Sequence, residues 1–486
     1  MARLIGLDVG TSSIKGIAID EEGAVLGVAE RAHPLSTPRP GWAEQDPEDW
    51  WAGTQAVLAE LDADRADGIG LAGQMHGLVA LDAHGEVLRP AILWNDGRTQ
   101  AQCDEIEERV GRDRLVALTG NRALAGFTAP KLLWVAKHEP DLFARVASVL
   151  LPKDWLRLCM TGEKVSEMSD AAGSLWLDVA GRCWSPELLA ACDLSEAQMP
   201  RLVEGSAVSA RLLPAIAREW GLPEGLPVAG GGGDNAASAV GIGAVAPGQG
   251  FLSLGTSGVM FVVTDRYRPN PVSAVHAFCH ALPGLWHQMS VTLSAASSLA
   301  WLTHLLGAAD EATLLGQAAA LTDEQRDAAP LFLPYLSGER TPHNDAAAQG
   351  LFFGLTHDTD PARLAWSVIE GVAFSMCDGL AALQAAGTTV GPLSLVGGGS
   401  RSALWAQLLA SALDLEMRIP EGGAAGGALG AARLAWLADG GSVATVCVAP
   451  GTRQTFMPSA TQRARLLPRY DRYRALYRAT RDLMPR

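Results

Sequence analysis

The chain contains one short pattern twice, and this repeat limits its possible folds more than any other feature. Gly10-Thr11-Ser12 separates two apolar runs within residues 4–19, and about half the chain later Gly255-Thr256-Ser257 does the same within residues 251–263. Short apolar runs on both sides of a turn of small residues predict a β-hairpin. Two such hairpins at this separation predict a core that is built twice.

The rest of the chain alternates between strand-like and helix-like segments, which is typical of an α/β fold. Strands are expected at residues 68–71, 78–81, 227–229 and 393–396, and helices at residues 99–110, 235–245 and 402–413. At about 150 residues per domain, 486 residues suggest two or three domains. The repeat favours two large ones, residues 1–245 and 246–486, with a hinge crossing near residues 243–250.

The net charge of −15 argues against a nucleic-acid partner or an anionic membrane surface, because both favour clustered Lys and Arg. Seven cysteines without a Cys-x-x-Cys pair suit reduced thiols in the cytoplasm. The uncharged stretch between Asp234 and Asp265 is long enough to span a bilayer. However, Pro247-Gly248 divides it, so we expect a helix, a turn and a buried strand pair instead.

Each Gly-Thr-Ser turn could direct several N–H groups and hydroxyls at one anion. Asp8 stands two residues before Gly10, where its carboxylate could ligate a Mg²⁺ that bridges phosphate oxygens. The second copy has Ser253 at the corresponding position. The alternative is a pair of ordinary hairpins, but the repetition favours phosphate binding.

Three further motifs combine glycines with polar side chains. "VAGGGGDNAAS" delivers Asp234 and Asn235 to a helix start, where Asp234 is either a plain helix cap or a general base for a hydroxyl. "LAGQMHGLVALD" and "LWNDGR" could form a polyol site, or a structural histidine and an Asn-Asp-Gly turn. "LSLVGGGSRS" could admit a flat adenine, although three glycines alone are weak support.

Taken together, the motifs resemble the FGGY family of carbohydrate kinases, in the superfamily of actin, hexokinase and the heat-shock ATPases. The similarity spans nearly the whole chain and rests on "GLDVGTSSIKG", "EQDPEDWW", "GQMHG", "AILWNDGR", "FTAPKLLWV", "SDAAGSLWLDV", "GGGDNAASAVG", "SLGTSGV" and "FLPYLSGERTPHND". Within the family, these motifs look most like those of members that phosphorylate the ketopentose D-xylulose. The resemblance implies two actin-like (ribonuclease H-like) α/β domains with a catalytic cleft between them.

The resemblance also implies a role for each candidate residue. Mg²⁺ is expected near Asp8, and ATP is expected to contact Thr11, Ser12, Gly255, Thr256, Ser257, Gly398 and Gly399. The sugar is expected to contact Gln74, Met75, His76, Trp94, Asp96, Asp234 and Asn235, with Asp234 as the catalytic base. One departure is Ala424-Ala425, where relatives commonly carry one or two acids, which leaves the detail of that nucleotide-side loop open.

The expected reaction is transfer of the γ-phosphoryl group of ATP to the 5-hydroxyl of D-xylulose, giving D-xylulose 5-phosphate and ADP. Three alternatives stay open: a kinase for another pentulose or polyol such as ribulose or xylitol, a non-catalytic sugar sensor, and a chaperone-like ATPase. The two acids Asp8 and Asp234 count against the sensor. We expect a cytoplasmic enzyme of pentose catabolism and, because relatives are often dimers, a possible homodimer.

Overall fold

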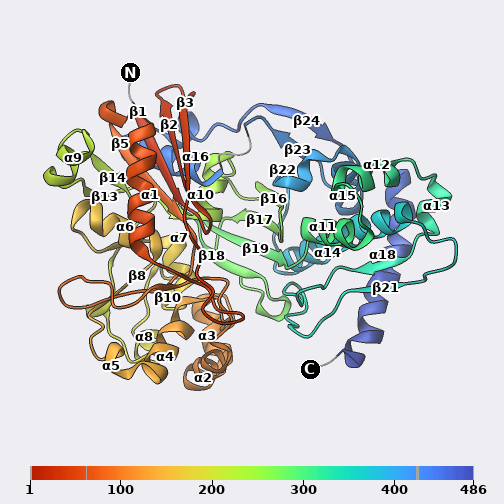
Figure 1. Ribbon diagram of the computed structural model, residues 1–486, viewed down its shortest axis with the longest axis horizontal. Helices are drawn as coiled ribbons and strands as arrows, with labels where there is room; N and C mark the ends of the chain where they lie inside the picture. The colour runs from red at the N-terminus through yellow and green to blue at the C-terminus, as the bar shows by residue number, and fades with distance from the viewer. Residues whose placement is uncertain (1–2, 62, 423–425, 485–486) are drawn as a thin grey trace.

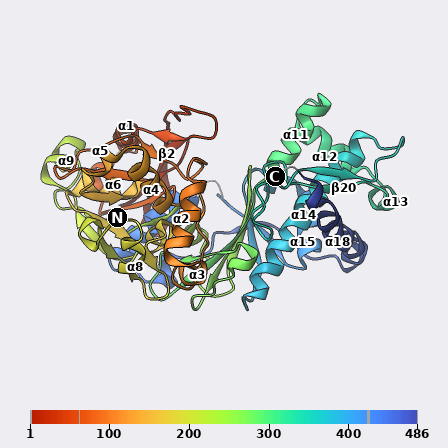
Figure 2. The ribbon, with the colours of Figure 1, turned by 90° about the horizontal axis from the view of Figure 1, so that it is seen from below.

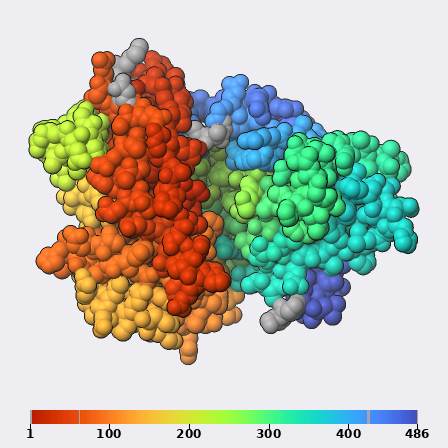
Figure 3. Space-filling view, viewed as in Figure 1, coloured from red at the N-terminus to blue at the C-terminus, as the bar shows by residue number. Residues whose placement is uncertain are grey.

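The computed structural model describes residues 3–61, 63–422 and 426–484. It has two halves, each built on a seven-stranded mixed sheet, and the chain passes from one to the other near its middle (Figure 1). Seen from below, the N-terminal and C-terminal halves stand side by side and are joined by the strands between them (Figure 2). The space-filling view shows a hollow between the halves (Figure 3). The predicted α/β fold with two lobes and an interdomain cleft is confirmed.

The N-terminal sheet has the order β13-β14-β5-β1-β2-β3, with β15 also paired to β5. Its strands are β1 (Arg3–Val9), β2 (Ser13–Asp20), β3 (Val25–Ala32), β5 (Gly68–Gly73), β13 (Val208–Arg211), β14 (Pro227–Ala229) and β15 (Gly232–Gly233). Strand β1 runs antiparallel to β2 and parallel to β5.

The C-terminal sheet has the order β18-β19-β17-β16-β22-β23-β24. Its strands are β16 (Gly250–Leu254), β17 (Gly258–Thr264), β18 (His276–Cys279), β19 (Trp286–Thr292), β22 (Leu393–Val396), β23 (Met417–Pro420) and β24 (Thr452–Phe456). Strand β16 runs antiparallel to β17 and parallel to β22. This repeats the pairing of β1 with β2 and β5, so the Gly-Thr-Ser repeat does mark a duplicated core.

Helices pack against both sheets. The larger ones are α1 (Pro47–Glu60), α2 (Gln100–Val110), α4 (Thr128–His138), α6 (Pro152–Thr161), α10 (Asp234–Gly241), α11 (Ala296–Leu306), α12 (Glu311–Ala319), α14 (Pro361–Ala385), α15 (Ala403–Leu413), α16 (Gly426–Ala438) and α18 (Ala460–Thr480). The smaller ones are α3 (Arg112–Thr119), α5 (Pro140–Phe143), α7 (Met168–Ala171), α8 (Pro186–Ala190), α9 (Pro214–Trp220), α13 (Asp323–Asp327) and α17 (Val443–Val446).

Within the described residues, five two-stranded sheets accompany the two large ones. They pair β4 (Glu44–Gln45) with β7 (Ala91–Ile92), β6 (Val79–Leu81) with β8 (Ser148–Leu150), β9 (Val165–Glu167) with β12 (Arg201–Val203), β10 (Leu177–Asp178) with β11 (Cys183–Trp184), and β20 (Leu331–Leu333) with β21 (Leu351–Phe353). One apolar cluster joins residues of the N-terminal half, such as Met75 and Phe127, to Phe261 and Phe278 of the C-terminal sheet. The two halves therefore share a hydrophobic core.

Helix α16 belongs to the second half of the sequence but packs on the N-terminal sheet. Its small residues permit this, because a Cβ atom at Gly6 of β1 would lie 1.9 Å from the carbonyl oxygen of Ala428. A Cβ at Gly430 would likewise lie 1.7 Å from the carbonyl oxygen of Ala237 in α10. Helices α10 and α16 thus cross at backbone distance between the lobes (Figure 1). The domain boundary between residues 245 and 246 stays a prediction. Helix α16 follows this boundary in the sequence but packs against the N-terminal half.

The uncharged stretch between Asp234 and Asp265 forms α10, a turn and the strand pair β16-β17, as expected. In the described part of the chain, one other segment, α14, is long and apolar enough to cross a membrane by composition. However, 89% of its most apolar window is buried inside the C-terminal half. Helix α14 is thus placed as the core helix of that half.

Candidate active site

The turn between β1 and β2 is held from its carbonyl side. Gly10 N–H donates to the carbonyl of Ser13 at 3.0 Å, and Gln45 Nε2 donates to the carbonyl of Thr11 at 2.7 Å. The backbone N–H of His33 donates to the carbonyl of Ser12 at 3.1 Å. Carbonyl oxygens would repel a phosphate, so engaging them with protein donors suits a turn that binds an anion.

The turn between β16 and β17 is held in the same manner. Gly255 N–H donates to the carbonyl of Ser257 at 3.1 Å. The start of α11 supplies the other donors, since Ala296 N–H reaches the carbonyl of Gly255 at 2.8 Å and Ala295 N–H reaches that of Thr256 at 2.9 Å. The two predicted phosphate turns therefore share their local chemistry as well as their sequence.

Asp8 is half-buried near the end of β1, and its Oδ1 is buried without a hydrogen-bond partner among the described residues. Burial raises its pKa to about 7, the carboxylate of Asp234 adds to the rise, and Lys15 opposes it. A carboxylate oxygen that is desolvated and unpaired is suited to a cation.

Asp234 is the first residue of α10, directly after the glycines of β15. Burial raises its pKa to about 6, while Asn235 opposes the rise through hydrogen bonds to Oδ1 from its backbone N–H at 2.7 Å and from Nδ2 at 3.0 Å. A carboxylate with a pKa near 6 is ionised at neutral pH and still basic enough to accept a hydroxyl proton. The structure thus brings Asp8, Asp234 and Asn235 together.

Met75 packs against the glycine segment that carries Asp234, and His76 is the next residue in the chain. A Cβ atom at Gly233 would be 2.8 Å from the sulfur of Met75, so the methionine packs on the residue before Asp234. His76 Nδ1 lies 2.6 Å from the carbonyl of Gly173, which requires a proton on Nδ1. Burial lowers the pKa of His76 to about 3, so the ring is neutral and Nε2 is a hydrogen-bond acceptor.

His76 also has a backbone φ of 70°, a conformation that costs energy for a residue with a Cβ. Its ring packs against Phe127 at 4.6 Å and against Phe278 at 6.0 Å between ring centroids. The histidine is therefore held rigidly at the shared core, with an aromatic residue from each half beside it.

Gln74 and Trp94 connect to the first hairpin turn. Thr11 Oγ1 donates to Gln74 Oε1 at 3.1 Å and accepts from Trp94 Nε1 at 2.9 Å. Gln74 is buried, whereas the side chain of Trp94 is about half exposed. Their predicted contact with a sugar stays a prediction; in this structure they support the Gly-Thr-Ser turn between β1 and β2.

The carboxylate of Asp96 is engaged within the protein. Both of its oxygens accept from the Arg98 guanidinium, at 2.9 and 2.6 Å, and Oδ2 also accepts from Ala43 N–H at 2.6 Å. Arg98 in turn stacks over Trp42 at 3.5 Å and pairs with Glu44 at 2.7 Å. Asp96 is thus the centre of a buried ion pair, and its role in sugar binding stays a prediction.

Gly398 and Gly399 lie in η5 (Gly398–Arg401), which begins two residues after the last residue of β22. A Cβ at Gly399 would be 2.4 Å from the side chain of Leu254, the last residue before the second Gly-Thr-Ser turn. A Cβ at Gly398 would meet no atom within 4 Å. One glycine is needed for packing, and the other leaves open surface beside the turn, as an adenosine would require. Ala424-Ala425 lies outside the described residues.

Several residues at the site were assigned no role from the sequence, although they lie in the motifs that carried the resemblance. Gln45 joins the turn to Gln74 at 2.9 Å, and Lys131 Nζ donates to the carbonyl of His76 at 2.7 Å. Arg340, from the second half, lies 3.3 Å from His276 and helps lower the pKa of His76. Nothing in residue type alone indicates these contacts, because each depends on a partner far away in the sequence.

Comparison with known proteins identifies the class. The N-terminal domain of the FGGY family of carbohydrate kinases matches residues 3–241, and the C-terminal domain of that family matches residues 250–438. The chain therefore belongs to the FGGY family of carbohydrate kinases, and it is a kinase.

Individual relatives narrow this class. The chain is 49% identical to the xylulose kinase of Escherichia coli strain K12, over 99% of each chain, and 52% identical to that of Klebsiella pneumoniae, over 89% of each. A crystal structure of a xyloylose kinase from Brucella ovis has a TM-score of 0.95 at 48% identity, covering 99% of this chain and 100% of that one. The predicted family and actin-like fold are confirmed.

Proposed function

We propose that the protein transfers the γ-phosphoryl group of ATP to the 5-hydroxyl of D-xylulose, giving D-xylulose 5-phosphate and ADP in pentose catabolism. The observation that carries the proposal is Asp234, a desolvated carboxylate whose charge helps to raise the pKa of Asp8 and whose preceding residue, Gly233, packs against Met75. The 49% identity to a xylulose kinase over nearly the full length supports this substrate. ATP as the donor follows from the kinase family.

In this proposal Asp234 accepts the proton of the attacking hydroxyl. Asn235 keeps the carboxylate ionised and oriented through its two hydrogen bonds. His76 offers the lone pair of Nε2 to another sugar hydroxyl, and Met75 covers the carbon chain. A base in the correct protonation state near neutral pH contributes about 10² to 10⁴ to the rate.

The nucleotide lies in the cleft between the two Gly-Thr-Ser turns. Thr11 and Ser12 contact the phosphates from one lobe, Gly255, Thr256 and Ser257 contact them from the other, and Gly398 and Gly399 border the adenosine. Closing the lobes around both substrates excludes water and so limits wasteful hydrolysis of ATP.

The residues fit a Mg²⁺ ion at Asp8. The fit rests on the buried Oδ1, which accepts no hydrogen bond from the described residues. Among those residues no cluster of three or more His, Cys, Asp or Glu side chains could hold a metal alone. This suits Mg²⁺, which is usually held by one or two carboxylates together with water and substrate phosphates. When bound, the ion would offset negative charge on the β- and γ-phosphoryl oxygens.

The test is ADP release measured in a coupled assay with MgATP, with D-xylulose, D-ribulose, xylitol and glycerol compared at equal concentration. Release that depends on D-xylulose, with a kcat/KM at least tenfold above the other sugars, is the expected result. Preference for ribulose or xylitol would mean that the same site phosphorylates another pentulose or a polyol. Release that no sugar stimulates would contradict the sugar-kinase assignment.

We also propose a cytoplasmic location and a homodimer. All seven cysteines are free thiols, as expected for a reducing compartment. The dimer rests only on the resemblance to the family. Light scattering of the purified protein at several concentrations distinguishes a dimer from a monomer.

A further inference from the structure

The glycine-rich segment 229–233 carries the chain from β14 to Asp234 with almost no side chains to anchor it. A Cβ at Gly231 would lie 1.9 Å from the carbonyl oxygen of Leu71, so the segment fits against β5 only as glycine. A segment without side chains is fixed by its backbone hydrogen bonds. The donors and acceptors around residues 229–233 therefore decide where Asp234 lies.

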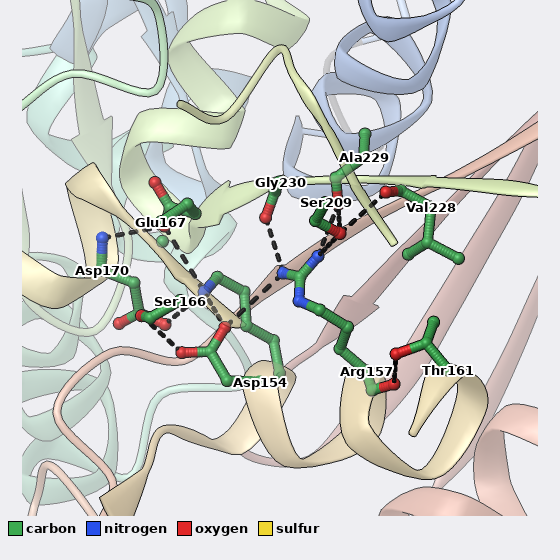
Figure 4. Close-up of polar contacts among 12 residues, drawn as sticks. Asp154, Arg157, Thr161, Ser166, Glu167, Asp170, Ser209, Val228, Ala229 and Gly230 are labelled. Atoms are coloured by element: carbon green, nitrogen blue, oxygen red, sulfur yellow. Dashed lines mark hydrogen bonds and ion pairs between the residues drawn. The ribbon is translucent and has the colours of Figure 1, made fainter. Parts of the chain in front are cut away.

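Arg157 of α6 holds the beginning of this segment. Its Nη1 donates to the carbonyl of Ala229 at 2.6 Å, and its Nη2 donates to the carbonyl of Gly230 at 2.6 Å (Figure 4). The same Nη1 donates to Ser209 Oγ at 2.6 Å, and that hydroxyl reaches the carbonyl of Val228 at 2.8 Å. The fully buried guanidinium thus fixes two consecutive peptide groups.

Ser169 of α7 holds the end of the segment. Its Oγ accepts a hydrogen bond at 3.0 Å from the N–H of Gly233, the residue before Asp234. Glu167 orients Ser169, because it accepts from the hydroxyl at 2.8 Å and from the backbone N–H at 2.7 Å. The hydroxyl proton is thereby directed to Glu167, which leaves a lone pair for Gly233.

Arg157 and Glu167 belong to one buried charge cluster with Lys153, Asp154 and Asp170, whose side chains are all fully buried. Lys153 Nζ lies 2.7 Å from Asp154, 3.4 Å from Glu167 and 3.0 Å from Asp170, and Arg157 lies 3.5 Å from Asp154. Figure 4 shows the acids beside α6 and Arg157 reaching the glycine segment. Burying ionised side chains costs several kcal/mol per ion before pairing, so such a cluster is a poor device for stability alone.

We propose that Arg157 and Ser169 are positioning residues, which fix the carboxylate of Asp234 for proton abstraction through the backbone of residues 229–233. The inference rests on the proposed role of Asp234 as the base. A misplacement of about 1 Å at a reacting group can cost about 10² in rate. Loosening either anchor should therefore lower kcat without weakening the binding of either substrate.

Two variants test the anchors. Ser169→Ala removes the acceptor of Gly233, and Arg157→Lys keeps the charge but cannot hold two carbonyls with one planar group. We expect kcat to fall about 10-fold to 100-fold in each, with the KM values for D-xylulose and MgATP within about twofold of the wild-type values.

Arg469→Lys is the matched control. Arg469 is also a buried arginine that donates to backbone carbonyls, those of Asp327 at 2.6 Å, Ala329 at 3.0 Å and Pro330 at 3.4 Å, and pairs with Glu370. It lies in α18 of the C-terminal half, away from Asp234. This variant should lower the thermal midpoint to a similar degree as Arg157→Lys and leave kcat unchanged.

The double variant Asp234→Ala/Ser169→Ala tests whether the serine acts through the aspartate. Once the carboxylate is gone, Ser169→Ala should cause no further loss beyond Asp234→Ala alone. If Ser169→Ala lowered kcat in the Asp234→Ala background by the same factor as it does in the wild type, the inference would be overturned. Wild-type kcat in Ser169→Ala and Arg157→Lys while Asp234→Ala is inactive would also overturn it, and that result would leave the proposed function intact. Full activity of Asp234→Ala would instead remove the proposed base.

Discussion

Gly427 of α16 lies directly against the carboxylate of Asp8, so that a Cβ atom at Gly427 would be 2.3 Å from Oδ2. A helix from the second half of the sequence thus covers an acid near its beginning. Because α16 also packs against α10, which begins with Asp234, the two acids of the site are held by one pair of crossing helices.

Gly427→Ala should displace either the Asp8 carboxylate or α16. We expect kcat to fall at least about tenfold and the Mg²⁺ concentration for half-maximal rate to rise. Gly316→Ala in α12 is the control, because a Cβ there meets no atom within 4 Å and should stabilise the helix by about 0.5 to 1 kcal/mol. Steady-state rates over a Mg²⁺ titration check this; unchanged kinetics in Gly427→Ala would mean that Asp8 does not depend on the contact.

Asp234→Ala should lower kcat by about 10² or more, because the hydroxyl loses its proton acceptor. The affinity for MgATP should stay nearly unchanged, since other residues make the proposed contacts with the phosphates. Fluorescence titration with a nucleotide analogue measures the binding, and single-turnover kinetics measure the chemical step. Loss of nucleotide binding with an unchanged chemical step would contradict the assignment.

The acid limb of the pH profile should report Asp234. Its pKa is raised to about 6 by burial, so kcat/KM should fall as the pH drops through about 6 and the base becomes protonated. Asn235 holds this pKa down, and Asn235→Ala removes the 3.0 Å bond from Nδ2, so the midpoint of the limb should move to higher pH. Profiles at saturating Mg²⁺ test the sign. A shift to lower pH would rule out this explanation.

The duplicated core was predictable because hairpins depend on local patterns. Apolar runs flank the small turn residues at Gly10 and at Gly255. Each of these patterns can be recognised from residues that are close together in the sequence. The position of α16 was not predictable in the same way. The glycines of "GGALG" indicate close backbone approach, but they do not say that the partner is β1, some 420 residues earlier.

The same difference between local patterns and distant contacts applies to the candidate site. Asp8, Asp234, Met75 and His76 were recognisable because glycines beside them mark places where a ligand or a backbone comes close. Asp96 also stands beside a glycine. However, Arg98 follows only two residues later, and its guanidinium donates hydrogen bonds to both carboxylate oxygens of Asp96. No sequence pattern indicated Lys131 or Arg340. Their lowering of the His76 pKa arises only when distant segments of the chain fold together.

The basic C-terminal helix α18 should be a structural part of the C-terminal half. Arg469 and Glu370 form a pair at 2.6 Å with 7% and 1% of their side chains exposed. Arg469→Met leaves a buried carboxylate unpaired and should cost about 3 to 5 kcal/mol of unfolding free energy, whereas Arg469→Met/Glu370→Met should recover most of it. Urea denaturation measures both. A single variant as stable as the wild type would mean that water reaches Glu370 and that α18 is not firmly docked.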